Sequence, residues 1–108
     1  MAQSFAAGRA VRLNEVHTVA DGLAAPYAGD MTYLLTRRYV DDVVVLPDDS
    51  IVDAMRQVLA FCKLVVEPAG AAAVAALLEG RVPIAAGDTV VAVLSGGNID
   101  LDRLKNLL

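Results

Sequence analysis

A serine and two glycines that end a short apolar run are the residues best placed to do chemistry. Residues 90–94 are branched and uninterrupted, which predicts a strand covered on both faces. Ser95, Gly96 and Gly97 follow at its carboxyl end, where ligands bind in open α/β sheets. Glycine at such a point either brings the backbone close to a flat ligand or adopts a positive φ. The same spacing also fits a plain corner between a strand and a capped helix, so the pattern alone leaves both interpretations open.

Two further segments complete a larger pattern. Residues 18–24, 65–73 and 93–100 read TVADGLA, VVEPAGAAA and VLSGGNID. Together and in this order they resemble the C-terminal part of the pyridoxal-phosphate-dependent serine/threonine dehydratases. Those enzymes belong to the fold type II, or tryptophan synthase β-like, group, which includes serine racemase. The resemblance implies that residues 1–108 form one α/β domain that is the C-terminal part of such a catalytic domain.

The resemblance implies a role for each residue of the cofactor site. Ser95 would hydrogen-bond the pyridine nitrogen of pyridoxal phosphate, Gly96 and Gly97 would shape the turn beside the ring, and Gly22 would lie against one ring face. A neutral hydroxyl, unlike an aspartate, does not hold the ring nitrogen protonated. The ring is then a weaker electron sink, which suits β-elimination of a hydroxyl from a small amino acid such as serine or threonine.

Glu67 has two interpretations. It stands before Pro68 at the start of an expected helix, where exposed amides and the helix dipole favour a carboxylate. That interpretation needs no ligand. In the enzymes that the chain resembles, the matching glutamate lies close to the cofactor ring, so a polar cofactor-binding role is the alternative. We assign no general base here.

The imine-forming lysine and the glycine-rich phosphate loop of that family lie N-terminal to the matched portion, and neither occurs in residues 1–108. Lys63 and Lys105 are the two lysines of the chain, and both are expected to be solvated or snorkelling side chains. The lone histidine, His17, is expected to face solvent, because no second ligand residue is spaced to join it. We therefore assign no catalytic residue and no metal ligand.

Alternating helices and strands must position these residues. The pattern predicts helices over 1–10, 21–25, 31–39, 47–62, 68–78 and 101–108, a short extended piece over 11–13, and strands over 43–46 and 88–94. Cys62 is expected to be a buried small hydrophobic residue. The aspartates at 41–42 and 48–49 are expected to cap the starts of the strand and the helix that follow them. Asn98 or Asp100 is expected to cap the last helix. This alternation predicts an α/β fold, a partial three-layer αβα arrangement with parallel strands, as in the large-domain part of fold type II enzymes.

The hydrophobic content and the net charge of the chain indicate which binding partners it can have. Hydrophobic residues make up 56% of the 108 residues and the mean hydropathy is +0.53, both high for a small soluble domain. We therefore expect apolar surface that a second copy, as in a dimer, or the missing N-terminal half of the enzyme covers. A net charge of -4 argues against nucleic acid and anionic membranes as targets, and no apolar stretch reaches the length of a membrane span. The single cysteine and the lack of a signal segment agree with a cytoplasmic location.

The leading hypothesis is the C-terminal portion of a threonine/serine dehydratase-like enzyme. The intact enzyme would deaminate L-threonine to 2-oxobutyrate and ammonia, or L-serine to pyruvate, and this portion alone would be inactive. The alternative is a standalone α/β binding or oligomerisation module that uses the vacated cofactor surface for a small ligand or a partner chain. Hydrolase, zinc and nucleotide motifs are absent from the sequence.

Overall fold

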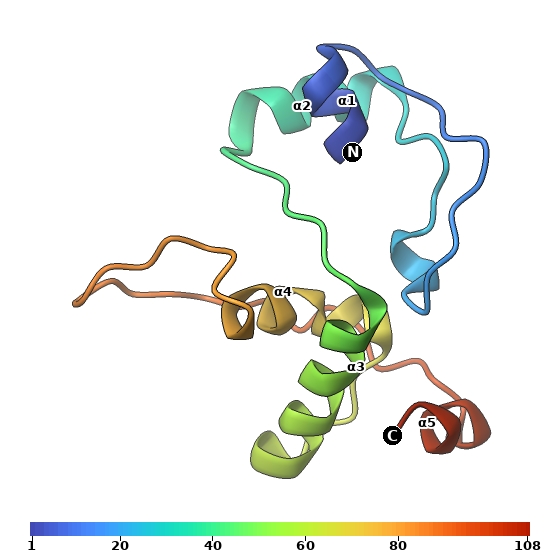
Figure 1. The fold of residues 1–108 in the computed structure, drawn as a ribbon, viewed down its shortest axis with the longest axis vertical. Coiled ribbons are helices and arrows are strands. Elements are labelled where there is room, and N and C mark those ends of the chain that lie inside the picture. The colour runs from blue at the N-terminus through green and yellow to red at the C-terminus, as the bar shows by residue number, and fades with distance from the viewer. The chain divides into compact units, whose positions relative to one another are not determined.

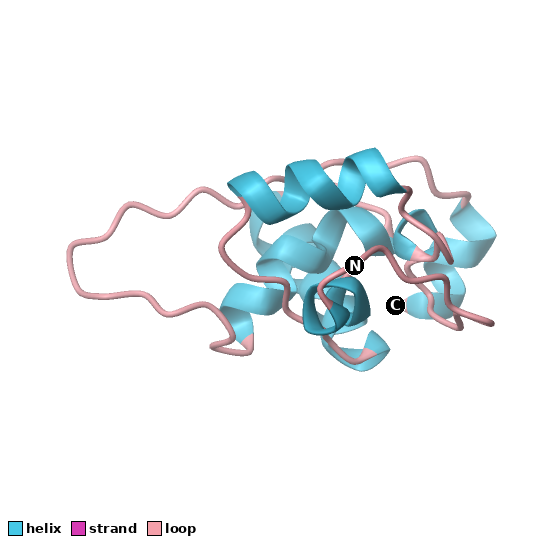
Figure 2. Ribbon diagram, turned by 90° about the horizontal axis from the view of Figure 1, so that it is seen from above, coloured by secondary structure: helices cyan, strands magenta, loops and turns pink.

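A computed structural model describes residues 1–108 as helices joined by irregular connections (Figure 2). In chain order the elements are α1 (Ala2–Ala7), the 3-10 turn η1 (Asp21–Leu23), α2 (Asp30–Tyr39), α3 (Asp48–Gln57), the π-helical turn η2 (Val58–Cys62), α4 (Pro68–Leu78) and α5 (Leu101–Leu107). The expected helices are present within a few residues of their predicted bounds, except that residues 21–25 form only the three-residue 3-10 turn η1 and the helix expected over 47–62 changes to a π-helical turn at Val58. The chain divides into two compact units, one of Met1–Thr18 with Ala24–Val45 and one of Val19–Leu23 with Leu46–Leu108. No helix combines the length and the apolarity that crossing a bilayer requires.

The strands expected over 43–46 and 88–94 do not form, and the parallel-strand layering is therefore not confirmed. A strand exists only when a neighbouring segment pairs with its backbone N–H and C=O groups. Within residues 1–108 no such ladder forms around the two segments. Residues 81–91 are all exposed and form the long orange loop that follows α4 in Figure 1. An apolar, branched composition was therefore not enough to predict a strand, because a strand also needs a neighbouring segment to pair with.

The first unit is held together by a few specific contacts. α1 ends at Gly8, whose φ of 67° is left-handed, and the chain then turns back so that Val11 N–H donates to the buried Ser4 hydroxyl at 3.0 Å. The guanidinium of Arg37, near the end of α2, lies 5.0 Å from the centre of the Phe5 ring. The first contact holds residue 11 against α1, and the second connects α1 with α2 inside the unit.

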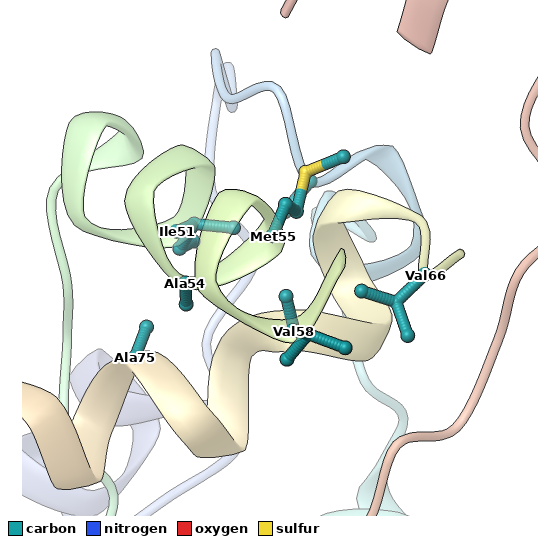
Figure 3. Close-up of a cluster of buried hydrophobic side chains, with 8 residues drawn as sticks. Ile51, Ala54, Met55, Val58, Val66 and Ala75 are labelled. Carbon is teal, nitrogen blue, oxygen red and sulfur yellow. The ribbon is translucent and has the colours of Figure 1, made fainter. Parts of the chain in front are cut away.

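The core of the second unit lies between α3 and α4 (Figure 3). Met55 of α3 is 1% exposed and is among the largest fully buried side chains. Small side chains at Ala54, Ala71 and Ala75 let the two helices approach closely. The buried cluster consists of Ala20, Ile51, Ala54, Met55, Val58, Val66, Ala71 and Ala75. The cluster fixes α4, and with it the segment that precedes α4.

The expectation that Cys62 is buried is wrong, because the helix changes its winding before that residue. From Val58 the backbone forms a π-helical turn, which holds more residues per turn than an α-helix and so rotates the apolar face. Val58 is still buried, whereas Phe61 is 81% exposed and Cys62 is exposed. Lys63 ends the turn in the left-handed conformation with φ 60°, and its Nζ donates to the carbonyl of Ala60 at 2.6 Å.

Both ends of α4 follow from local sequence. Pro68 occupies the first turn, where its fixed φ suits a helix and its missing N–H costs nothing. At the other end Gly80, with φ 63°, donates its N–H to Leu77 O at 3.0 Å, and Arg81 donates to Ala76 O at 2.9 Å. This pair of bonds is the Schellman motif. The start of α4 is therefore a well-defined position on which neighbouring segments can pack.

Candidate functional site

Glu67, directly before α4, lies between two glycines from distant parts of the chain. Its N–H donates to the carbonyl of Gly96 at 3.0 Å. Its carboxylate packs against Gly96, where an added Cβ would meet Oε1 and would lie 2.9 Å from Cδ. The same Oε1 is 3.9 Å from the position that a Cβ on Gly22 would take. Three of the predicted site residues, Gly22, Glu67 and Gly96, are thus brought together within the second unit.

The glycines are needed because protein segments approach one another here. A Cβ on Gly22 would lie 2.9 Å from the Cβ of Ala69, and one on Gly97 would lie 2.7 Å from the carbonyl oxygen of Val65. Gly96 and Gly97 do not have a positive φ, which leaves close approach of the backbone as the expected alternative for these two residues, and Gly22 has no positive φ either. Their lack of a side chain allows η1, residues 65–70 and residues 95–97 to converge.

Gly70 was not among the predicted site residues, although it belongs to the same contact. A Cβ on Gly70 would lie 2.5 Å from the carbonyl oxygen and 2.9 Å from the nitrogen of Gly96. The sequence did carry a signal for it. Glycine is about 1 kcal/mol less favourable than alanine inside a helix, so a glycine that interrupts a run of alanines points to a steric requirement.

The Glu67 side chain does not cap α4. Glu67 holds the N-cap position with φ −75° and ψ 162°, but its carboxylate makes no cap hydrogen bond. The carboxylate is half-buried against Gly96 instead. The simple helix-start interpretation therefore accounts for its position in the chain and not for the direction of its side chain.

Ser95 precedes this contact and is exposed, as is Gly97, whereas Gly96 is half-buried. Ser95 is consequently accessible to a ligand. Asp100 caps the following helix α5, accepting from the N–H of Arg103 at 2.8 Å, which decides between the two expected caps. Residues 95–100 thus pass from the contact with Glu67 directly into a capped helix.

Arg103 links α5 to the segment that carries Gly22, a contact that no feature of the sequence marked. Its Nη1 donates to Asp21 Oδ2 at 2.7 Å and its Nη2 to the carbonyl of Val19 at 2.8 Å. The hydrogen bond from Arg103 lowers the pKa of the Asp21 carboxyl below its ordinary value. The pKa of Arg103 is raised by the same bond, and its guanidinium stays charged.

The remaining predicted residues lie as follows. His17 is 86% exposed and its Nε2 lies 3.0 Å from a carboxylate oxygen of Glu15, in keeping with a solvent-facing histidine. Lys105 is exposed on α5. Asp48 was expected to cap a helix, but α3 has no side-chain cap, and its carboxylate accepts from the N–H of Val19 at 2.9 Å. Asp48 therefore helps to anchor the segment 19–23.

Comparison with known proteins gives a consistent result. Residues 1–96 match the family described as "Pyridoxal-phosphate dependent enzyme". Serine racemase of Oryza sativa subsp. indica is 40% identical over 107 residues, which are 95% of this chain and 31% of that protein. L-threonine ammonia-lyase of Thermotoga maritima is 39% identical over 108 residues, covering 100% of this chain and 26% of that protein. The chain thus spans about a quarter to a third of the length of these curated relatives.

Solved structures of enzymes of the same kinds resemble this chain in fold. Maize serine racemase superimposes with a TM-score of 0.85 at 42% identity, covering 97% of this chain and 33% of that one. A threonine deaminase from T.th. superimposes with a TM-score of 0.83 at 36% identity, covering 93% of this chain and 36% of that one. These similarities support an α/β fold of the fold type II group, and the family implies pyridoxal phosphate as cofactor. The family match over most of the chain shows that this protein belongs to the pyridoxal-phosphate-dependent enzymes.

Proposed function

We propose that this chain supplies the ring side of a pyridoxal phosphate site, as the C-terminal portion of a threonine/serine dehydratase-like enzyme. The observation that carries the proposal is the convergence of Gly22, Glu67 and Gly96 from three separate segments. These are the positions that the family resemblance assigns to the cofactor. The proposed reaction of the whole enzyme is the deamination of L-threonine to 2-oxobutyrate and ammonia, or of L-serine to pyruvate.

The residues around Gly96 fit the ring of the cofactor. A pyridine nitrogen accepts one hydrogen bond, and the exposed Ser95 hydroxyl can donate it. A flat ring needs surface free of side chains, and Gly22 and Gly97 are exposed and offer only backbone. When bound, the cofactor supplies an electron-withdrawing ring that stabilises negative charge at the α-carbon of the amino acid.

Each side chain then has a distinct task. Ser95 would orient the ring through its nitrogen without charging it, because a hydroxyl is neutral. Gly22 and Gly97 would let the backbone contact the ring, and Gly96 would keep residues 95–97 bonded to Glu67. The Glu67 carboxylate would place a polar group near the ring edge. None of these tasks transfers a proton, and we propose no catalytic residue in this chain.

We further propose that the chain is inactive by itself and that its single α/β domain is completed by another portion of the enzyme. Neither lysine has the setting of an imine-forming amine: Lys63 Nζ is engaged by the carbonyl of Ala60, and Lys105 is exposed on α5. Parallel strands over 43–46 and 88–94 would form once neighbouring strands pair with them. A cytoplasmic location and a homo-oligomeric state belong to this proposal.

The second candidate is a standalone module that binds a small ligand or a partner chain. It is favoured by the many exposed apolar side chains, among them Phe61 at 81%, Val91 at 82% and Leu101 at 80%. Such a module would use the same scaffold without the cofactor chemistry. The two candidates differ in whether a cofactor ring binds at Gly22 and residues 95–97: the first expects binding there and the second does not.

The test combines a spectrum, a trapping step and an assay. The purified chain is mixed with pyridoxal phosphate, its visible absorption is recorded before and after borohydride, and the product is analysed by mass spectrometry. L-threonine deamination is assayed alongside, with Lys63→Met and Lys105→Met as controls for surface adducts. The proposal expects no specific adduct and no 2-oxobutyrate. A reduced adduct at one lysine, lost in that variant and accompanied by turnover, would contradict the proposed inactivity.

A further inference from the structure

Arg103 connects the two segments of the proposed ring site, residues 19–23 and residues 95–97. It lies in the first turn of α5, which follows residues 95–100 without interruption. Its two guanidinium nitrogens reach Asp21 at 2.7 Å and the Val19 carbonyl at 2.8 Å, on either side of Ala20. A planar guanidinium can hold two acceptors in a fixed geometry, which a lysine cannot do.

The segment 19–23 needs such an anchor because Gly22 within it has no side chain. Gly22 contributes only backbone, so its neighbours must set its position. Ala20 is 1% exposed in the core, and Val19 N–H donates to Asp48 on α3. Arg103 adds the connection to α5, and Gly22 then fits against Ala69 with no room for a Cβ.

We propose that Arg103 is a positioning residue that fixes Asp21 and Gly22 relative to Ser95–Gly97. The inference rests on the proposed function, since it assigns Gly22 to a ring face and Ser95 to the ring nitrogen. Because α5 begins just after residues 95–97, a guanidinium on its first turn ties the segment before Gly22 to the segment after Ser95. Losing this tie would let the two sides of the ring site move independently.

Arg56 provides a matched control within the same unit. It too pairs with a carboxylate, Asp53 at 2.6 Å, and donates to a carbonyl of α5, Leu107 at 3.0 Å. Arg56→Met therefore loosens the far end of α5 and leaves the Arg103–Asp21 contact in place. Arg103→Lys keeps the charge and removes the two-acceptor geometry.

Two measurements are made on the whole chain and its variants. Amide hydrogen exchange reports the order of residues 19–23 without any ligand. Binding of pyridoxine 5′-phosphate, which carries the ring and phosphate and cannot form an imine, is followed by NMR shifts of the Gly22 and Ser95 amides. We expect Arg103→Met to speed exchange at residues 19–23 about fivefold, the size of a well-placed surface ion pair, and to weaken binding by a similar factor. Arg103→Lys should recover less than half of both effects, and Arg56→Met should change neither.

The outcomes separate this inference from the function on which it rests. Unchanged exchange at residues 19–23 in Arg103→Met overturns the positioning role. Faster exchange with unchanged ligand binding makes Arg103 a structural contact only, and also overturns the proposal. If the unsubstituted chain shows no shift at Gly22 or Ser95 at millimolar ligand, the proposed function itself fails and the ring-site part of this inference fails with it.

Discussion

At the scale of single residues, close packing between protein segments explains most of the candidate site. Glu67 occupies the space that a side chain on Gly96 would fill, and Ala69 occupies the space that one on Gly22 would fill. The glycines of this site are therefore explained by the packing of three segments, and the exposed Ser95 is the residue left to meet a ligand. The sequence identified Gly22, Glu67 and Gly96 as candidates through a family pattern, whereas Gly70 and Arg103 required the three-dimensional contacts.

Replacement of Gly70 by alanine should destabilise the chain, although alanine is the better helix former. The added Cβ would overlap backbone atoms of Gly96 at 2.5 and 2.9 Å, which no side-chain rotation relieves. Overpacking of this kind costs about 1–3 kcal/mol, more than the roughly 1 kcal/mol that helix propensity returns. Ala73→Gly, at an exposed position of the same helix, should lose only about 1 kcal/mol by propensity. A Gly70→Ala chain that is more stable in urea unfolding than the original would disprove this packing.

The Asp21–Arg103 pair should respond to acid in a defined direction. Arg103 lowers the pKa of Asp21, so the folded chain holds the carboxylate ionised more strongly than the unfolded chain does. The contribution of this pair to stability is therefore fully present above the ordinary aspartate pKa of about 3.9, and is lost as pH falls through the lower folded value. An NMR titration of the Asp21 carboxyl should show the lowered pKa, and Arg103→Met should return it upward. An Asp21 pKa that Arg103→Met leaves unchanged would count against the contact.

At the scale of elements, the helices followed from local sequence and the strands did not. Caps and breakers such as Pro68, Gly80 and Asp100 act within a few residues, so the bounds of α4 and α5 were close to those expected. Strands over 43–46 and 88–94 depend on partners that local composition cannot supply. The winding change at Val58 was also missed, because a regular 3.6-residue period was assumed through Cys62.

The contact between α3 and α4 should dominate the stability of the second unit. Met55 is 1% exposed, so Met55→Ala removes buried side-chain volume and leaves a cavity. Such truncations cost about 2–5 kcal/mol. Met31→Ala is the matched control, since Met31 is 70% exposed and its truncation should stay within about 0.5 kcal/mol. Equal unfolding midpoints for the two variants in denaturant, followed by circular dichroism, would contradict the assigned core.

At the scale of the whole molecule, both units expose large apolar side chains. Met31 is 70% exposed in the first unit, and Phe61 is 81% and Val91 82% exposed in the second. The high apolar fraction of the sequence anticipated this exposure. Because the relatives are three to four times longer than the matched segment, we propose that the uncovered area meets other parts of an enzyme or a second copy.

The exposed apolar surface should make the isolated chain self-associate. Light scattering over a concentration series should show a mass that rises above that of the monomer, with dimer as the first species. Added sulfate should strengthen the association, because this salt favours the burial of apolar surface and screens the repulsion between chains of net charge -4. A constant monomer mass at the highest concentration reached would contradict this prediction.

The most direct test of the proposed ring site is a map of where a cofactor ring binds the chain. Pyridoxine 5′-phosphate is titrated into the labelled protein while the amide NMR signals are followed, with Ser95→Ala as the comparison. Shifts that concentrate at Gly22, Glu67 and residues 95–97, and that weaken in Ser95→Ala, are the expected result. Shifts confined to other regions, or identical shifts in Ser95→Ala, would show that these converging segments do not form the ring site.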